Sequence, residues 1–347
     1  MRQQQGSEVS KRRSVGRLAM VMAVVAAVCA LFAGAAQASV ISIGSVLPKE
    51  PTPTKFERVQ TLFNTALPEP GATLASPVNG AIVRWRIQGA KGGPFYLRVL
   101  HPNGKGQFEA TGTSQGASPT DEGLQTFNTN LKVKAGDLIG IDPTSVEDMI
   151  GVVDVSGASY ASIFPTPFEG SAVPSTETVS GKEIELAAEI QPQPEVTAVS
   201  PPFGSIAGGT VVTLTGTSFN QASEVKFGST PAGFTVDSDT EITTTVPQSV
   251  KPGSVDVSVT TFAGTNPNTR FDDYVYTACV VPQLKNRTLK AAKSLLRRRG
   301  CKLGHVKKMD AAKAKDVGKV LKQQPKAGKI LPPGARVRIQ LGVKPKA

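Results

Sequence analysis

Residues 200–219 read SPPFGSIAGGTVVTLTGTSF, and this stretch decides the fold at the centre of the chain. Proline and glycine mark the turns that bound it. Between them, apolar and polar side chains alternate, which places Val212 and Leu214 on the same face of a strand. Three more strands are predicted downstream, at 224–228, 241–246 and 254–260. This region therefore predicts a sandwich of short strands.

The same alternation extends toward the N-terminus, and helical periodicity is nearly absent before residue 288. The alternating runs are IVRWRI (82–87), FYLRVL (95–100), LKVKAGDLIGID (131–142) and EIELAAEI (183–190). Their spacing predicts a first β-sandwich over residues 39–190, with a jelly-roll-like appearance and no recognisable family or ligand. QPQP (191–194) is expected to be a linker, because proline is excluded from central strands and helix interiors.

The central region resembles the IPT/TIG family. The resemblance lies in the opening stretch and in KFG (226–228), TVP (245–247) and PGSVDVSV (252–259). The residues that match the family's turn and core positions are Pro201, Gly204, Gly208, Gly209, Gly216, Phe219, Gly228 and Pro247. The resemblance implies an immunoglobulin-like sandwich over residues 195–277, which acts as a spacer or binding module and has no catalytic residues.

A different pattern begins near residue 280. VVPQL (280–284) suggests a short strand, and TLKAAKSLLRRRG (288–300) predicts a helix. Thr288 can cap this helix and Gly300 can end it. Its apolar stripe consists of Leu289, Ala292, Leu295 and Leu296. Two or three strands are expected after it, in GHV (304–306), KVLKQQPKAG (319–328) and ARVRIQLG (335–342).

This order of elements resembles a PASTA domain over residues 279–345. The matching residues are Pro282, Leu284, Thr288, Ala292, Leu296, Gly300, Val320, Gln323, Pro325, Gly328, Gly334 and Val337. The resemblance implies a small α+β domain that binds peptidoglycan. Asn286 replaces the usual glycine before the helix, although asparagine also tolerates turn geometry. The cysteines Cys279 and Cys301 are an addition to the family pattern.

The first 38 residues have the pattern of a signal peptide. Lys11, Arg12, Arg13 and Arg17 precede an apolar run over 18–36, and Ala36-Gln37-Ala38 fits a signal-peptidase site. We expect a secreted, extracellular or cell-wall-associated chain that begins at Ser39. The alternative is an uncleaved segment that anchors the protein in the membrane. Cleavage would remove Cys29 and leave Cys279 and Cys301, which an oxidising compartment is expected to pair.

The charge is distributed unevenly. Residues 279–347 contain 20 lysines and arginines against Asp310 and Asp316, whereas residues 40–278 carry a net charge of −10. The segment LRRRGCKLGHVKK (296–308) is the most basic part. Its candidate contacts with a wall polyanion are Arg297, Arg298, Arg299, Lys302, Lys307 and Lys308. A solvated basic face with no ligand is the simpler interpretation.

Other partners fit the basic segment less well. Nucleic acid is not expected, because no aromatic residue follows Cys279 to stack on bases and the signal peptide directs the chain out of the cell. Cys301 and His305 supply only two of the three or four ligands that a metal site needs. We therefore expect no metal and no cofactor.

Signs of catalysis are weak in residues 40–190. GTSQG (112–116) fits the nucleophile-elbow pattern, but Ser114 lies in a Gly/Ser-rich loop with no helix after it. Asp137, Asp142, Glu147, Asp148 and Asp154 are expected on solvent-facing turns and not around calcium. Trp85 is expected in the sandwich core. The sequence thus favours a non-catalytic envelope-binding protein, with two alternatives: a secreted hydrolase with its site in 40–190, or an adhesin whose basic tail binds polyanions non-specifically.

Overall fold

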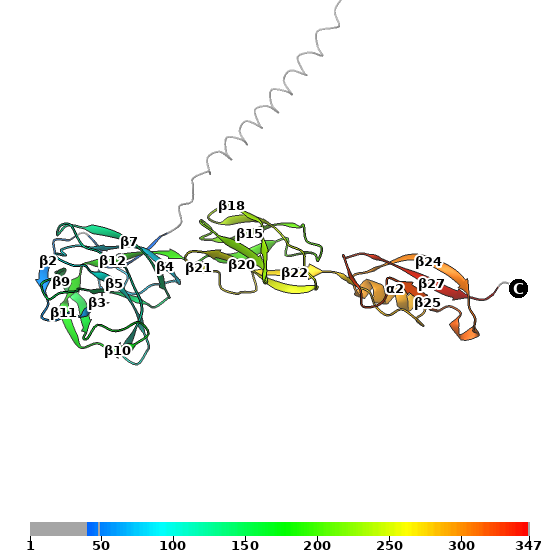
Figure 1. The fold of residues 1–347 in the computed structure, drawn as a ribbon, viewed down its shortest axis with the longest axis horizontal. Helices are drawn as coiled ribbons and strands as arrows, with labels where there is room; N and C mark the ends of the chain where they lie inside the picture. The colour runs from blue at the N-terminus through cyan, green and yellow to red at the C-terminus, as the bar shows by residue number, and fades with distance from the viewer. Residues whose placement is uncertain (1–39, 48, 346–347) are drawn as a thin grey trace, which may run out of the picture. The chain divides into compact units, whose positions relative to one another are not determined.

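The computed structural model describes residues 40–47 and 49–345, so the predicted signal peptide lies outside the described residues. Short strands dominate this part of the chain (Figure 1), and α2 (Leu289–Arg298) is its only α-helix. The predicted fold class, mainly β with a small α+β domain at the end, is confirmed. None of the described helices has the length and apolar character needed to cross a membrane.

The first domain is a sandwich of two sheets. One has the strand order β1-β12-β4-β7 and the other β10-β6-β5-β8-β3-β9-β11, with β2 paired to β9. Trp85 on β4 and Leu97 on β5 are fully buried in the core between the sheets, which confirms the predicted position of Trp85. The strands are β1 (Ile41–Gly44), β2 (Thr52–Lys55), β3 (Thr61–Ala66), β4 (Gly80–Ile87), β5 (Tyr96–Pro102), β6 (Gln107–Thr113), β7 (Gln125–Val133), β8 (Leu138–Asp142), β9 (Met149–Ile163), β10 (Ala172–Pro174), β11 (Glu177–Ile184) and β12 (Leu186–Pro192).

Two predicted runs in this domain are each divided between two strands. The run 131–142 contains the end of β7 and all of β8, separated by a turn in which Gly136 has a φ of +92°. The run 183–190 contains the end of β11 and the start of β12, with Glu185 between them. Alternation alone could not locate these breaks, because apolar residues lie on both sides of each.

The predicted linker 191–194 is longer than the real one. Gln191 and Pro192 belong to β12, where they pair with Ala81 and Gly80 of β4. The prediction was wrong for these two residues because β1 stops pairing with β12 at Ile190. Beyond that point one edge of β12 is open, so proline's missing N–H leaves no ladder hydrogen bond unmade there.

The second domain is also a two-sheet sandwich. Its sheets have the orders β13-β15-β19-β18 and β14-β22-β20-β16-β17, with β21 paired to β20. The four predicted strands match β15, β16, β19 and β20, and Val212 and Leu214 are buried as expected. The strands are β13 (Glu195–Ser200), β14 (Phe203–Ser205), β15 (Val211–Thr217), β16 (Glu224–Phe227), β17 (Thr230–Ala232), β18 (Phe234–Ser238), β19 (Glu241–Thr245), β20 (Gly253–Thr261), β21 (Gly264–Thr265) and β22 (Asp273–Thr277).

Close packing explains one of the glycines in the opening stretch. A Cβ at Gly216 would lie 1.9 Å from the carbonyl oxygen of Glu195 and 2.5 Å from the ring of Phe219. Phe219 is fully buried in the core of this domain. Gly216 therefore lets β13 and a core aromatic ring approach the β15 backbone.

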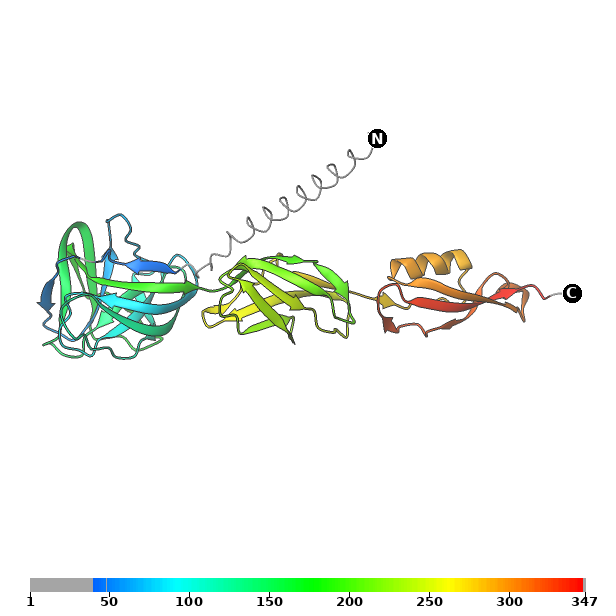
Figure 2. The same ribbon diagram turned by 90° about the horizontal axis from the view of Figure 1, so that it is seen from above.

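The C-terminal domain packs α2 against a three-stranded sheet of order β24-β27-β25 (Figure 2). In this sheet β24 and β27 are parallel and β25 is antiparallel to β27. A separate pair, β23 with β26, completes the domain. The elements besides α2 are β23 (Cys279–Val280), β24 (Lys302–Asp310), the 3-10 helix η1 (Ala314–Asp316), β25 (Val320–Gln324), β26 (Ile330–Leu331) and β27 (Arg336–Val343).

Local chemistry fixes both ends of α2. The hydroxyl of Thr288 accepts a hydrogen bond from the N–H of Ala291 at 3.3 Å, and Gly300 has a φ of +69° just past the helix. Asn286 has a φ of +65°, so it adopts the left-handed turn expected of it. The buried face of the helix, with Ala292 and Leu296, packs in the core that includes the inward side chains of β25 and β27.

Candidate functional site

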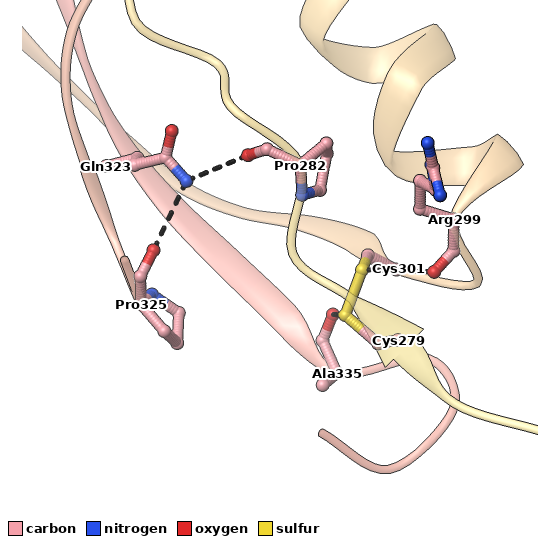
Figure 3. Close-up of a disulfide and its surroundings, with 7 residues drawn as sticks. All are labelled: Cys279, Pro282, Arg299, Cys301, Gln323, Pro325 and Ala335. Carbon is pink, nitrogen blue, oxygen red and sulfur yellow. Dashed lines mark hydrogen bonds between the residues drawn. A yellow bond between two sulfur atoms is a disulfide. The ribbon is translucent and has the colours of Figure 1, made fainter. Parts of the chain in front are cut away.

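A disulfide and a glutamine hold the C-terminal domain together at one end (Figure 3). Cys279 and Cys301 are bonded, with their Cα atoms 4.6 Å apart, and tie β23 to the residue just past α2. Gln323 donates from Nε2 to the carbonyls of Pro282 at 3.0 Å and Pro325 at 3.3 Å. Its Oε1 accepts from the N–H of Leu284 at 2.7 Å.

The Gln-x-Pro-x-x-Gly element thus has a structural role. Gln323 links three backbone positions that no regular ladder connects. At the other end of the element, the N–H of Gly328 donates to the carbonyl of Val281 at 2.8 Å. These bonds attach the segment after β25 to the one before α2, and they position the sheet on which the basic side chains stand.

The positive charges of this domain are not neutralised within it. In residues 279–345, as far as the structure describes them, no lysine or arginine takes part in an ion pair. All the described ion pairs lie in the first two domains. The basic surface is therefore available to an external anion.

The six predicted contact residues do not form one cluster. Arg297 and Arg298 end α2 and Arg299 follows them; we call these three the helix-end arginines. Lys302 and Lys307 lie on β24 opposite Arg336 and Gln340 of β27, on the sheet face turned away from α2. Lys308 pairs with Leu341 and so points to the other face.

The sheet face turned away from α2, which we call the open face, gathers basic and amide side chains from all three strands. Its exposed or half-exposed residues are Lys302, His305, Lys307, Lys322, Gln324, Arg336, Arg338 and Gln340. On the same strands Val337, Ile339 and Val320 point the opposite way, into the core under α2. The alternation of side chains along each strand thus separates a solvent-exposed cationic face from a buried apolar face.

Part of the open face is hollowed. A depression of about 310 Å³ is lined by residues of β24, β25 and β27, namely His305, Lys307, Lys322, Gln323, Gln324, Arg338, Ile339 and Gln340. Register places Gln340 beside both Lys307 and Lys322, and Arg338 beside Gln324. Each cation therefore has an amide neighbour that can donate a further hydrogen bond to the same anion.

Sequence reasoning missed the contributions of Lys322, Arg336 and Arg338 to this face. The signal was present, since ARVRIQL (335–341) alternates cations or amides with Val337 and Ile339. What the sequence could not supply was the strand order, which brings residues from 305, 322 and 338 side by side. His305 lies on β24, as expected of a strand residue.

In the first domain Ser114 lies in the loop after β6, and its hydroxyl is hydrogen-bonded to the backbone. Its hydroxyl accepts from the N–H of Leu97 and donates to the carbonyl of Gln115, both at 2.8 Å. The chain continues as a loop into β7, with no helix after the serine. The histidine of this domain, His101, contacts Asp137 and not the serine, with 2.6 Å between its Nδ1 and Oδ1 of Asp137.

The acidic residues were predicted on solvent-facing turns, and this was wrong for all but Glu147, since three of them are buried and Asp154 lies on β9. Asp137, Asp142 and Asp148 are buried, whereas Glu147 and Asp154 are exposed. Asp142 accepts from Arg98 Nε at 2.9 Å and from Thr61 at 2.6 Å. Burial raises the pKa of Asp142, against the opposing charge of Arg98. Paired carboxylates can be buried in this way, which sequence composition does not reveal.

Two further buried carboxylates lie side by side next to Lys49. Glu183 and Glu185 are both fully buried, and the Lys49 ammonium lies 2.6 Å from Glu183 and 4.0 Å from Glu185. Lys49 also contacts Glu69. Burial, with the neighbouring charge of Glu183, raises the pKa of Glu185 to about 8. In the described residues no group of three or more His, Cys, Asp or Glu side chains is arranged to hold a metal ion.

Comparison with known proteins identifies two of the three domains. Residues 194–274 match the IPT/TIG domain, and residues 280–343 match the PASTA domain. No curated protein matches the chain. IPT/TIG domains are immunoglobulin-like, and PASTA domains are extracytoplasmic modules known to bind peptidoglycan.

Similarity to solved structures is weak. A Gamma-CGTASE from alkalophilic Bacillus clarkii is 18% identical, with a TM-score of 0.22, over 37% of this chain and 24% of that one. The plexin A4 extracellular region is 13% identical, with a TM-score of 0.23, over 65% of this chain and 34% of that one. TM-scores this low support no conclusion about function. The family matches alone show that the chain carries an IPT/TIG domain at residues 194–274 and a C-terminal PASTA domain at residues 280–343.

Proposed function

We propose that this is an exported, non-catalytic protein of the cell envelope whose PASTA domain binds peptidoglycan or anionic wall polymers. The two β-sandwich domains act as a spacer or as arms that bind a further ligand. The observation that carries the proposal is the PASTA domain itself, with a basic surface that makes no described ion pair.

Electrostatics supports binding at a wall rather than to a neutral ligand. Peptide stems carry carboxylates and associated wall polymers carry phosphates, and arginine can hold either group by two parallel hydrogen bonds. Lys302 and Lys307, on the open face, are the proposed contacts, and the helix-end arginines and Lys308 add positive charge that attracts the polymer without a fixed contact. Residues 40–278, which carry a net charge of −10, would be repelled by the same polymers.

Co-sedimentation of the purified protein with peptidoglycan tests the proposal. Two preparations are compared across a salt series, one intact and one stripped of its anionic secondary polymers. Binding to the intact preparation at low salt is the expected result, and binding to the stripped preparation that persists at about 1 M salt, where the screening length is about 3 Å, would indicate a shaped site for peptidoglycan itself. Absence of binding to both preparations at low salt would overturn the proposal.

A further inference from the structure

We infer that the open face of the PASTA domain is a binding site for a linear phosphodiester-linked polymer, laid along strands β24 and β27. The inference rests on the proposed function, since it names the chemical class of wall polymer and the surface that takes it. It assigns the site to the sheet and leaves the helix-end arginines a non-specific role.

The first support is the spacing of charge on the open face. Three successive rungs cross the sheet, in the order Lys302–Arg336, then Arg338–Gln324 with His305 nearby, then Lys307–Gln340–Lys322. Neighbouring strands are about 4.8 Å apart and alternate residues of one strand about 7 Å apart. Positive charge is thus repeated along the strand direction, which suits a ligand whose own charge is repeated along its backbone.

The second support is the pairing of cations with amides. Arg338 lies beside Gln324, and Gln340 lies between Lys307 and Lys322, around the 310 Å³ depression. A phosphodiester group has two free oxygens and a full negative charge, so one oxygen can accept from a cation while the other accepts from the neighbouring amide. The lining side chains in the described residues include no carboxylate to compete for the cations.

The third support is what the face lacks for a sugar-centred site. The sequence contains no aromatic residue after Tyr276, so this domain has no aromatic platform for a sugar ring. The helix-end arginines, by comparison, lie together at one helix end, and α2 carries no amide side chain. They offer charge without the amide partners or the depression.

Two triple variants of equal charge separate the surfaces. The open-face variant carries Lys307→Gln, Lys322→Gln and Arg338→Gln, and the matched control carries Arg297→Gln, Arg298→Gln and Arg299→Gln. All six residues are exposed, so both variants should keep the helical circular-dichroism signal of the parent protein. Binding is measured by calorimetry or sedimentation with poly(glycerol phosphate), with polyglutamate of equal charge, and with single-stranded DNA of equal charge.

We expect the parent protein to prefer poly(glycerol phosphate). The open-face variant should lose at least about tenfold in affinity for it, with a salt dependence shallower by about 2 in log–log slope for three lost contacts. The control variant should lose less than about threefold. Equal losses in the two variants or a preference for polyglutamate would each overturn the inference. Single-stranded DNA is also a linear phosphodiester polymer, so its affinity should fall more in the open-face variant than in the control, and equal losses there would overturn the inference as well.

Failure here is distinguishable from failure of the proposed function. Binding to stripped peptidoglycan without binding to poly(glycerol phosphate) would overturn this inference and leave the proposed function standing. Absence of binding to the polymer and to both peptidoglycan preparations would overturn both.

Discussion

At the scale of single residues, the buried carboxylates of the first domain lead to a prediction, because burial and neighbouring negative charge disfavour their ionised form. Glu185 is fully buried next to Glu183, and in the described part of the chain Lys49 is the one cation paired with them, and it is also shared with Glu69. Ionising both of two adjacent buried carboxylates costs free energy, because each loses hydration and the two negative charges repel, so one proton is retained. With a pKa of about 8, Glu185 is the group that keeps it at neutral pH, and it can donate to Glu183.

This pair makes the first domain sensitive to pH. The folded-state pKa of Glu185 is raised above its usual value of 4.5, so its stabilising effect is complete below about pH 4.5 and is lost as pH rises through 8. The free energy of unfolding should therefore fall by a few kcal/mol between pH 5 and 8, at up to about 1.4 kcal/mol per pH unit. Urea unfolding followed by the fluorescence of Trp85, the only tryptophan, reports on this domain alone.

Glu185→Gln is the variant that tests the cause. The amide keeps the shape and a donor for Glu183 but cannot ionise, so the decline in stability toward pH 8 should flatten. Glu169→Gln, at an exposed turn position, is the matched control and should retain the parent's pH dependence. An unchanged decline in Glu185→Gln would show that another group causes it.

At the scale of elements, the disulfide and α2 form one unit. The Cys279–Cys301 bond closes a separation of 22 residues that includes the whole helix. Cross-linking this loop should stabilise the domain by about 3 kcal/mol. Changing both cysteines to alanine should therefore lower the melting temperature of the helical circular-dichroism signal and leave the Trp85 transition unchanged. An equal melting temperature in the variant, or two titratable thiols in the folded processed chain, would contradict this.

The sequence predicted the individual strands and the helix better than it predicted which segments pair or pack with them. Alternation located β15 and β20, and the Thr288 cap and Gly300 stop located α2, because these signals act within a few residues. The end of β12 at Pro192 depended on where β1 stops pairing, and the burial of Asp142 depended on Arg98, 44 residues away. The open face depended on strand order in the same way. The end of β12, the burial of Asp142 and the open face are all decided by contacts between segments far apart in the sequence. A local sequence pattern carries no information on such contacts.

At the scale of the whole molecule, three features support the proposed export. The first 38 residues have a basic region, an apolar run and the Ala36-Gln37-Ala38 pattern. The cysteines that remain after Ser39 are joined in a disulfide, which is typical of oxidising compartments. The domain that carries them is of a family found outside the cytoplasm.

Processing is therefore the decisive prediction at this scale. Expressed in a bacterium with its own first 38 residues, the protein should be recovered outside the cytoplasm with Ser39 as its N-terminus, as shown by mass spectrometry of the intact chain. Ala38→Leu should block processing, because signal peptidase requires a small residue at that position, whereas Ala38→Gly should not. If the parent protein instead remains in the membrane fraction with residues 1–38 attached, the apolar run over 18–36 is an anchor. In that case the PASTA domain would be tethered to the membrane through the rest of the chain, and wall polymers would be bound by a membrane-anchored protein.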